Sequence, residues 1–355
     1  MTPAMDTAAE GTTPARPAAH DTATNRDWRW VLRVLAIVVV FGIVAVARSR
    51  QVGVGFHDPE GKLFTHKIVS TAIPLVLFAL IDVVVRWWRH RGEGARLWET
   101  ARTRWSPYRI AMIALALVAY QLVYFCYRNL KSWDAFLTPR DTMLQRWDKA
   151  LFAGHSPAVL LHDLLGQDVA ARFLAHWYES FTTVITLALC AAMAFAPTVR
   201  AAYVYVVSAM WTWILGVGSY YLIPSLGPFH EAPQEFAGLT RTSIQSTQEQ
   251  YVAQRDHLLA QPQAHDAFAQ ISAFASLHCA MTFLVVLMAR YYGLRLLSWV
   301  AAVFLAGTLV ATVYLGWHFA VDDVAGLLLA WVSVQLGKLT VTGSWRRPQE
   351  HGRTS

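Results

Sequence analysis

Eight apolar runs, each about long enough to cross a lipid bilayer, occupy most of this sequence between residues 31 and 336. A membrane-spanning helix takes roughly 17 to 25 mostly apolar residues. The runs lie at residues 31–47, 68–85, 109–127, 181–196, 202–223, 274–289, 296–315 and 319–336. With 55% hydrophobic and 15% charged residues, the chain is too apolar for a soluble domain of its size. We therefore predict an all-α, polytopic membrane protein with about eight transmembrane helices.

The segments between the runs divide the chain into four parts. Residues 1–27 are rich in Ala, Thr and Pro and have little apolar surface to bury, which predicts a disordered tail. This tail is too long and polar for a cleaved signal, so we expect the first run to be an uncleaved anchor. Residues 28–108 hold two transmembrane helices and a basic loop, residues 109–337 a six-helix core, and residues 338–355 a second tail.

Three segments outside the main runs have helical character. Residues 142–152 and 158–165 are predicted to form short amphipathic helices, and the run at 181–196 is compatible with a start near residue 170. The polar, Gln-rich segment 240–268 is compatible with an amphipathic helix that covers a site.

The basic residues indicate how the chain crosses the membrane. Although the formal net charge is +7, Lys and Arg lie in short segments between apolar runs, a pattern typical of membrane topology and not of nucleic-acid binding. With eight crossings, the side that holds both termini carries 18 basic residues and the other side 12. We therefore expect a protein of the plasma membrane with both termini in the cytoplasm. The segment 224–271 would then lie on the non-cytoplasmic side. The three cysteines lie in or beside apolar runs and predict no disulfide framework.

Two histidines lie where apolar runs begin. His278 opens the sixth run, and His318 precedes the eighth, with Asp322 four residues further on and on the same helical face. A neutral imidazole can attack phosphorus and carry a phosphoryl group. A carboxylate on its other nitrogen fixes the tautomer, and a second imidazole can protonate the leaving group. A buried structural pair, or a proton relay in a transporter, also fits His318 and Asp322.

Three stretches together resemble a known family. Residues 275–278 (Ala-Ser-Leu-His) and 314–322 (Tyr-Leu-Gly-Trp-His-Phe-Ala-Val-Asp) resemble the second and third motifs of the type 2 phosphatidic acid phosphatase superfamily. Residues 220–228 (Tyr-Tyr-Leu-Ile-Pro-Ser-Leu-Gly-Pro) stand where its inositolphosphotransferase-like branch, typified by fungal inositol phosphorylceramide synthase, has its first motif. The resemblance covers residues 109–336, so the six-helix core is expected to be catalytic.

The resemblance implies a role for each residue of the motifs. His318 would be the nucleophile, Asp322 its orienting partner, His278 the acid and base, and Ser276 a phosphate ligand. The first motif is as well explained by a helix stop as by a substrate-binding loop. Its candidate substrate-binding residues are Tyr221 and Pro224. The remaining histidines show no metal-ligand spacing, and we expect neither a metal nor a cofactor.

The cations of the phosphatase branch are missing from these motifs. Tyr220 and Gly227 stand where that branch has Lys and Arg in its first motif, and Thr312 stands where it has Arg in its third. Another source of positive charge is needed for a phosphate. By topology, the nearest candidates are Arg128 and Lys131 at the outer end of the third run, although such residues are commonly interfacial anchors.

Two further carboxylates have simpler explanations. Asp323 follows Asp322 directly and so points to a different helical face, where we expect it to cap the helix start. Asp148 together with Phe152-Ala153-Gly154 resembles a stretch of the same branch of the family. The alternative interpretation is that Asp148 lies on a solvated helix face.

The sequence therefore predicts a membrane lipid phosphotransferase that moves an inositol phosphate-like headgroup through a phosphohistidine. Its substrates would be a membrane lipid and a polar or lipid acceptor. The alternative within enzymes is a phosphatase that hydrolyses lipid phosphates or diphosphates, and the alternative outside enzymes is a proton-coupled transporter. Against the transporter, no inverted repeat is evident and both histidines lie at the ends of runs.

Overall fold

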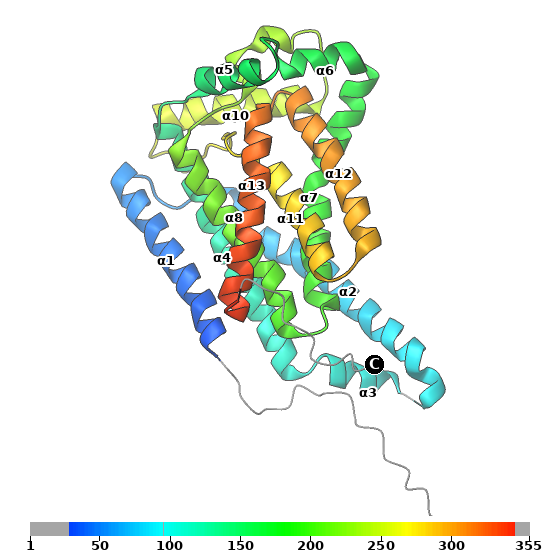
Figure 1. Cartoon of the computed structure of the whole chain (residues 1–355). Helices are drawn as coiled ribbons and strands as arrows, with labels where there is room; N and C mark the ends of the chain where they lie inside the picture. Colours follow the sequence, from blue (N-terminus) through cyan, green and yellow to red (C-terminus); the bar gives the residue numbers. More distant parts are fainter. Residues whose placement is uncertain (1–27, 95, 345–355) are drawn as a thin grey trace, which may run out of the picture.

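The computed structural model describes residues 28–94 and 96–344, and within them the protein is all-α, with no strand. The predictions for the tail at 1–27 and for the end of the second tail lie outside the described residues. Eight helices make up the body of the molecule (Figure 1). They are α1 (Arg29–Val52), α2 (Thr65–His90), α4 (Pro107–Trp133), α7 (Val169–Phe195), α8 (Val199–Leu222), α11 (Leu277–Tyr291), α12 (Arg295–Tyr314) and α13 (Ala320–Thr342).

Each of the eight predicted spans corresponds to one of these helices, but one helix is short. Among the described residues, seven are long and apolar enough to cross a membrane, whereas α11 has 15 residues. Most side chains of α11 are buried, and it packs against α12 and α13 in the centre of the bundle (Figure 1). A helix surrounded by protein need not match the bilayer thickness, which is why an apolar run near the minimum length suffices here.

The helix ends follow local sequence rules. Ser106 accepts the backbone N–H of Arg109 at the start of α4, and Thr198 accepts that of Ala201 at the start of α8. Such side chains satisfy N–H groups that have no partner inside the helix. At the other ends of α1 and α13, Gly53 and Gly343 adopt the left-handed conformation that commonly ends a helix.

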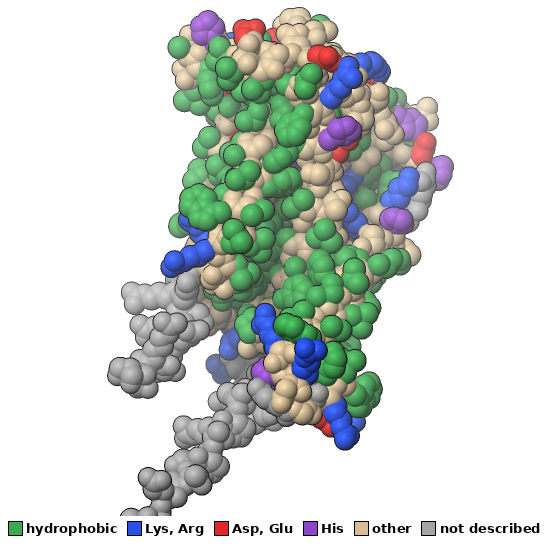
Figure 2. Space-filling model, turned by 90° about the vertical axis from the view of Figure 1, so that its right-hand side faces the viewer, with side chains coloured by type: hydrophobic (Ala, Val, Ile, Leu, Met, Phe, Trp, Pro, Cys, Tyr) green, Lys and Arg blue, Asp and Glu red, His purple; other side chains and the backbone are tan. Residues whose placement is uncertain are grey.

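The two ends of the bundle differ. At the upper end in Figure 1, a layer of shorter elements lies across the long helices: α5 (Asp141–Leu151), α6 (Pro157–Leu165), α9 (Pro228–Glu231) and α10 (Ser243–Ala260). The first two confirm the amphipathic helices predicted there. At the lower end lie α3 (Leu97–Arg104) and the short turns between α7 and α8 and between α11 and α12. Hydrophobic side chains cover much of the surface between the two ends (Figure 2).

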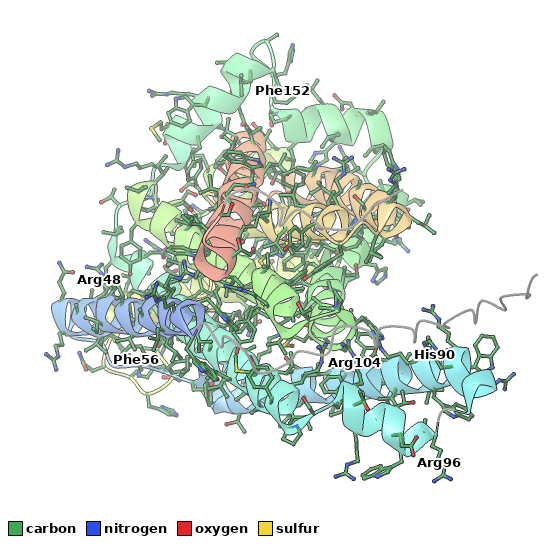
Figure 3. All side chains as sticks on the ribbon, turned by 60° about the horizontal axis from the view of Figure 1, so that its bottom comes forward. Arg48, Phe56, His90, Arg96, Arg104 and Phe152 are labelled. Carbon is green, nitrogen blue, oxygen red and sulfur yellow. The ribbon has the colours of Figure 1, made fainter. Side chains whose placement is uncertain are left out.

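Two arginines of the predicted basic loop have structural partners at the lower end. Arg104 donates to the backbone oxygens of Ala194, Ala196 and Pro197 and pairs with Asp82 at 2.6 Å (Figure 3). The buried Arg109 donates to the oxygens of Ala194 and Ala196 as well. Both guanidinium groups therefore cap the last carbonyl groups of α7, which have no partner inside that helix.

Candidate active site

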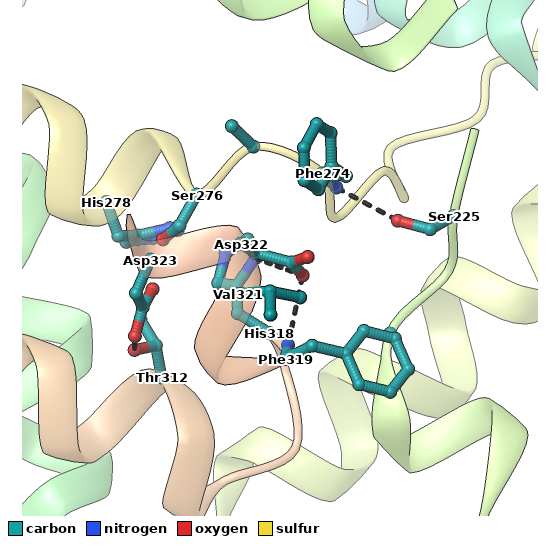
Figure 4. Close-up of polar contacts among 12 residues, drawn as sticks. Ser225, Phe274, Ser276, His278, Thr312, His318, Phe319, Val321, Asp322 and Asp323 are labelled. Carbon is teal, nitrogen blue, oxygen red and sulfur yellow. Dashed lines mark hydrogen bonds and ion pairs between the residues drawn. The ribbon is translucent and has the colours of Figure 1, made fainter. Parts of the chain in front are cut away.

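Three loops that are far apart in sequence meet under the upper layer. The first motif joins α8 to α9, the second begins α11, and the third joins α12 to α13. Backbone hydrogen bonds hold them together: Ser276 N donates to Asp322 O at 3.0 Å, and Phe229 N to Gly316 O at 3.0 Å. In addition, Phe274 N donates to the hydroxyl of Ser225 at 2.9 Å (Figure 4). The three predicted motifs thus form one assembly.

Two glycines allow this close approach. A Cβ atom on Gly326 of α13 would lie 2.3 Å from the backbone oxygen of Ser276, and one on Gly227 would lie 2.6 Å from the backbone oxygen of Trp317. Gly227 also has a φ of +107°, a backbone conformation that residues other than glycine rarely adopt. Replacement of either glycine would push two of the three loops apart.

The two histidines face one another across the assembly. Their ring centroids are 5.9 Å apart. His278 stacks on the ring of Tyr178 at 4.3 Å, with the tyrosine hydroxyl 3.5 Å from its Nδ1 atom. His318 is buried, and its Nδ1 lies 3.6 Å from Oδ2 of Asp322. Burial lowers the pKa of His318 to about 4, an effect larger than the opposing influence of the Asp323 carboxylate. The imidazole of His318 is therefore neutral at ordinary pH.

Asp322 lies behind His318 and is fully buried. Its Oδ2 atom accepts the backbone N–H of Phe319 at 3.0 Å (Figure 4). Within the described part of the chain, neither its Oδ1 atom nor Nδ1 of His318 has a hydrogen-bond partner. Buried polar atoms without a partner are costly and rare in folded proteins, and here two of them lie on neighbouring side chains of the same motif.

Two carboxylates from α5, which sequence reasoning did not assign, tie the third and first motifs to the upper layer. Asp148 accepts the N–H groups of Ala320 at 2.8 Å and Val321 at 3.0 Å, at the start of α13. Asp141, seven residues earlier, accepts those of Leu226 and Gly227. Burial raises the pKa of both carboxyl groups, and the donated N–H groups oppose that rise. The solvated helix face suggested for Asp148 is wrong, because its side chain is buried.

Asp323 also differs from its predicted capping role. Its Oδ2 atom accepts the Thr312 hydroxyl at 2.8 Å (Figure 4), and its Oδ1 atom accepts the Cys279 thiol at 3.0 Å. The carboxylate therefore links α13 to α12 and α11 through side chains. At the start of α13, the N–H groups of Ala320 and Val321 donate to Asp148, and that of the preceding Phe319 donates to Asp322. Asp148 lies on α5, which is far from α13 in the sequence. Its role in capping α13 therefore could not be predicted from the local sequence.

A cavity of about 360 Å³ opens beside the histidines. His278 and His318 line it together with Arg128 and Lys131, the two cations predicted from topology. Arg128 donates to the Tyr124 hydroxyl at 3.2 Å and to the side-chain oxygen of Gln270. The amino group of Lys131 lies 5.5 Å from the centre of the Tyr220 ring. Arg128 and Lys131 are one turn apart on α4, so both point to the same side of that helix.

Aromatic side chains and α10 enclose the cavity. The ring of Trp317 lies parallel to that of Tyr178, with 5.7 Å between their centres, and contacts Tyr251 from α10 at 5.8 Å. Ile244 and Thr247 of α10 also line the cavity. On the same helix, Gln248 donates to the backbone oxygen of Leu315 at 2.9 Å and so anchors α10 to the third motif. The helix predicted in the Gln-rich segment therefore lies over the histidines.

The other predicted site residues lie outside the cavity. Ser276 is buried and caps α11 by accepting the N–H of Cys279 at 3.4 Å. The backbone oxygen of Pro224 accepts the N–H of Arg140 at 2.7 Å. Tyr221 points to the far side of α8, where its hydroxyl donates to the backbone oxygen of Leu130 at 2.8 Å. Its neighbour Tyr220 faces the cavity instead.

Comparison with known proteins bears directly on this assembly. No curated protein and no solved structure matches the chain. A family model described as the PAP2 superfamily matches residues 142–336, which is more than half of the chain. This range contains the first, second and third motifs and most of the upper layer, whereas α1, α2 and α4, with Arg128 and Lys131, precede it. The resemblance read from the motifs is confirmed at this level: the protein belongs to the PAP2 superfamily.

Proposed function

We propose that this integral membrane protein is a lipid phosphotransferase that moves a phosphate-containing headgroup through a phosphohistidine on His318. Members of the superfamily are generally phosphatases or phosphotransferases and act on lipid substrates. The observation that carries the proposal is the shared cavity. His278 and His318 line it together with the two cations, Arg128 and Lys131.

The first half of the reaction would form a bond between His318 and phosphorus. With Nδ1 beside Asp322, Nε2 is the nitrogen left to attack. The bond from phosphorus to the lipid oxygen breaks, and protonated His278 gives its proton to that oxygen. Asp322 stabilises the positive charge that develops on the His318 ring, and Arg128 and Lys131 neutralise the phosphate oxygens.

The second half would use the same residues in reverse. Neutral His278 takes the proton of the acceptor hydroxyl while its oxygen attacks phosphorus. The phosphorus–nitrogen bond then breaks, and the ring of His318 returns to its neutral form. The rings of Trp317, Tyr178 and Tyr251 border the cavity, and an alcohol acceptor bound against them would be positioned to attack in preference to water.

The acceptor we favour is a polyol such as inositol, as in the inositolphosphotransferase-like branch. Polar side chains from Thr182, Thr247 and Ser272 line the cavity beside the aromatic rings, so hydroxyl groups and apolar ring faces would both find partners. We also propose that the catalytic core begins at residue 109, before the matched family range, because α4 supplies both cations. The site would open on the non-cytoplasmic side, with both termini in the cytoplasm.

The test is an assay of purified protein with labelled phospholipid, with and without inositol or another polyol. A new phosphorylated product that depends on the polyol would support the transferase. Release of free phosphate alone would indicate a phosphatase, and the absence of both would favour a transporter.

Rapid acid-free quenching and detection of phosphohistidine would test the roles of the two histidines. His318→Ala should form no covalent intermediate, whereas His278→Ala should still form it with a substrate whose leaving group needs little protonation. His265→Ala is the matched control, because the side chain of His265 is 99% exposed. A phosphorylated His278 in the His318→Ala protein would show that the two roles are reversed.

A further inference from the structure

A second cavity, separate from the one beside the histidines, lies between α1 and α8. It has a volume of about 890 Å³ and shares no lining residue with the first. Its walls are one face of α1 and one face of α8, with Leu130 of α4 at its base. Nearly all of these side chains are apolar. The α1 helix lies at the edge of the bundle (Figure 1), and Val40 and Val44 in the groove lining are exposed, so the groove opens to the surface that a membrane would cover.

The length of the groove matches one leaflet of a bilayer. Along α1, the lining extends from Ala36 to Gln51. At about 1.5 Å per helical residue, this is about 22 Å. Half of a bilayer, including its headgroup layer, is also about 20 to 22 Å thick. One acyl chain would therefore fit along the groove, with its polar end beside the last turn of α1.

A cation lies at that polar end. Arg48 donates to Gln51 at 2.9 Å and to the backbone oxygen of Trp133 at 3.4 Å, and its guanidinium lies 5.2 Å from the centre of the Tyr221 ring. Its Nε atom is buried and has no hydrogen-bond partner among the described residues. Figure 3 shows Arg48 on α1 on the same side of the molecule as Phe56 and away from Arg104. The hydrogen-bond partners of Arg48 named here are neutral, and the buried carboxyl group of Asp134 is close enough to interact with it electrostatically, so an anion in the groove would share this cation with Asp134.

We propose that this groove binds a second membrane lipid, an anionic glycerophospholipid. The phosphate of the lipid would contact Arg48, and one acyl chain would lie between α1 and α8. A guanidinium group suits phosphate because it offers several N–H donors in one plane. This site is independent of the proposed reaction and would be occupied in a protein without activity. Because Tyr221 and Leu130 line the groove while their neighbours Tyr220 and Lys131 line the first cavity, a bound lipid would lie directly behind the proposed phosphate site.

The test uses vesicles of phosphatidylcholine that contain a small fraction of a phospholipid with a photoreactive acyl chain. The probe is phosphatidylglycerol in one sample and phosphatidylcholine in the other, and cross-linked peptides are mapped after illumination. We expect phosphatidylglycerol to label α1 and α8 along the groove, and phosphatidylcholine to label them less. Equal labelling by the two probes would overturn the proposed charge recognition.

Two pairs of variants separate the groove from ordinary lipid contact. Arg48→Gln should lower phosphatidylglycerol labelling about tenfold, as expected for loss of one charged hydrogen bond. Arg50→Gln, an exposed arginine on the same helix, should not. Gly218 lies in the groove and Gly42 does not, and a Cβ atom on either would meet nothing within 4 Å. Gly218→Phe should therefore block labelling and Gly42→Phe should leave it unchanged. Unaltered labelling in both Arg48→Gln and Gly218→Phe would refute the site.

Discussion

The Nδ1 atom of His318 lies 3.6 Å from Oδ2 of Asp322, and the same oxygen accepts the backbone N–H of Phe319 at 3.0 Å. This carboxylate oxygen therefore caps the start of α13 and lies beside the imidazole without a hydrogen bond to it. The first distance is longer than a hydrogen bond, which for a charged pair is about 2.7 to 2.9 Å. Catalytic hydrogen bonds are often long before substrate binds, so this distance is compatible with an orienting role for Asp322.

Replacing Asp322 tests whether it orients His318 or only caps the helix. Asp322→Asn should keep the bond from Phe319, because the amide oxygen can still accept it. The variant should nevertheless lose roughly 10²- to 10⁴-fold in turnover, since the imidazole would no longer be held in the correct tautomer. Turnover and thermal stability should be measured on the same preparation. A loss of stability without a loss of rate per folded molecule would leave Asp322 with a capping role alone.

The lowered pKa of His318 makes a pH prediction. The neutral imidazole is the form that attacks phosphorus. An ordinary histidine, with a pKa of about 6.5, would be mostly protonated and unreactive below that pH. With its pKa at about 4, His318 should stay unprotonated, and reactive, well below the ordinary value. The measurement needs the His278→Ala variant and a phosphate ester with a nitrophenol leaving group, so that no second histidine contributes. A half-maximal rate near pH 6.5 would contradict the prediction.

Asp148 should matter to both stability and rate. Asparagine has one side-chain oxygen where Asp148 uses two, so Asp148→Asn would leave Ala320 or Val321 without its partner. Loss of a helix cap typically costs about 0.5 to 2 kcal/mol. We expect a lower melting temperature and slower turnover, because His318 lies just before the capped helix.

The control for Asp148→Asn is Asp163→Asn. Asp163 lies exposed on α6, in the same upper layer. Its replacement should change neither melting temperature nor turnover. If the two variants behave alike, the contacts of Asp148 with α13 contribute nothing measurable.

The features that the sequence predicted correctly depend on local pattern. Apolar runs identified the eight helices of the bundle, seven long ones and the shorter α11, because hydrophobic length is read directly from the chain. Arg128 and Lys131, chosen because they lie at the outer end of a predicted span on the same side as the motifs, line the cavity beside the histidines, and their role as phosphate ligands stays a prediction. Topology alone was enough to bring these residues near the histidines.

The features that it missed depend on contacts between distant residues. Asp148 contacts Ala320, 172 residues away, and a lone carboxylate on a short amphipathic helix resembles a solvated residue. A usable signal was the spacing of Asp141, Leu144 and Asp148, which places three side chains on one face of α5, and all three are buried. Tyr221 was predicted to bind substrate, but Tyr220 is the residue that lines the cavity, because α8 is apolar on most sides and its orientation is decided by packing.

The two cations of α4 should contribute separately from the histidines. Lys131→Met and Arg128→Gln should each lower kcat/KM by about 10- to 100-fold, the value of one charged hydrogen bond to phosphate. Phosphohistidine should still form, only more slowly. Arg146→Gln is the control, because Arg146 is exposed on α5 and does not line the cavity. Activity unchanged in both variants would mean that the phosphate is bound elsewhere.

The orientation of the protein can be tested with single cysteines. Ser246 lies exposed on α10 in the upper layer, and Ser344 is exposed after α13 at the opposite end. The sequence count of 18 basic residues on the side predicted to hold both termini, against 12 on the other, predicts that the end of the bundle with α3 faces the cytoplasm. In intact cells, a membrane-impermeant thiol reagent should therefore label Ser246→Cys and spare Ser344→Cys. Background should be low because Cys190 and Cys279 are buried and Cys126 is partly buried. Arg104 and Arg109 cap α7, so part of the basic excess has a structural cause and does not report on topology. The labelling therefore tests the orientation independently of the charge count. The reverse pattern would put His278 and His318 on the cytoplasmic side.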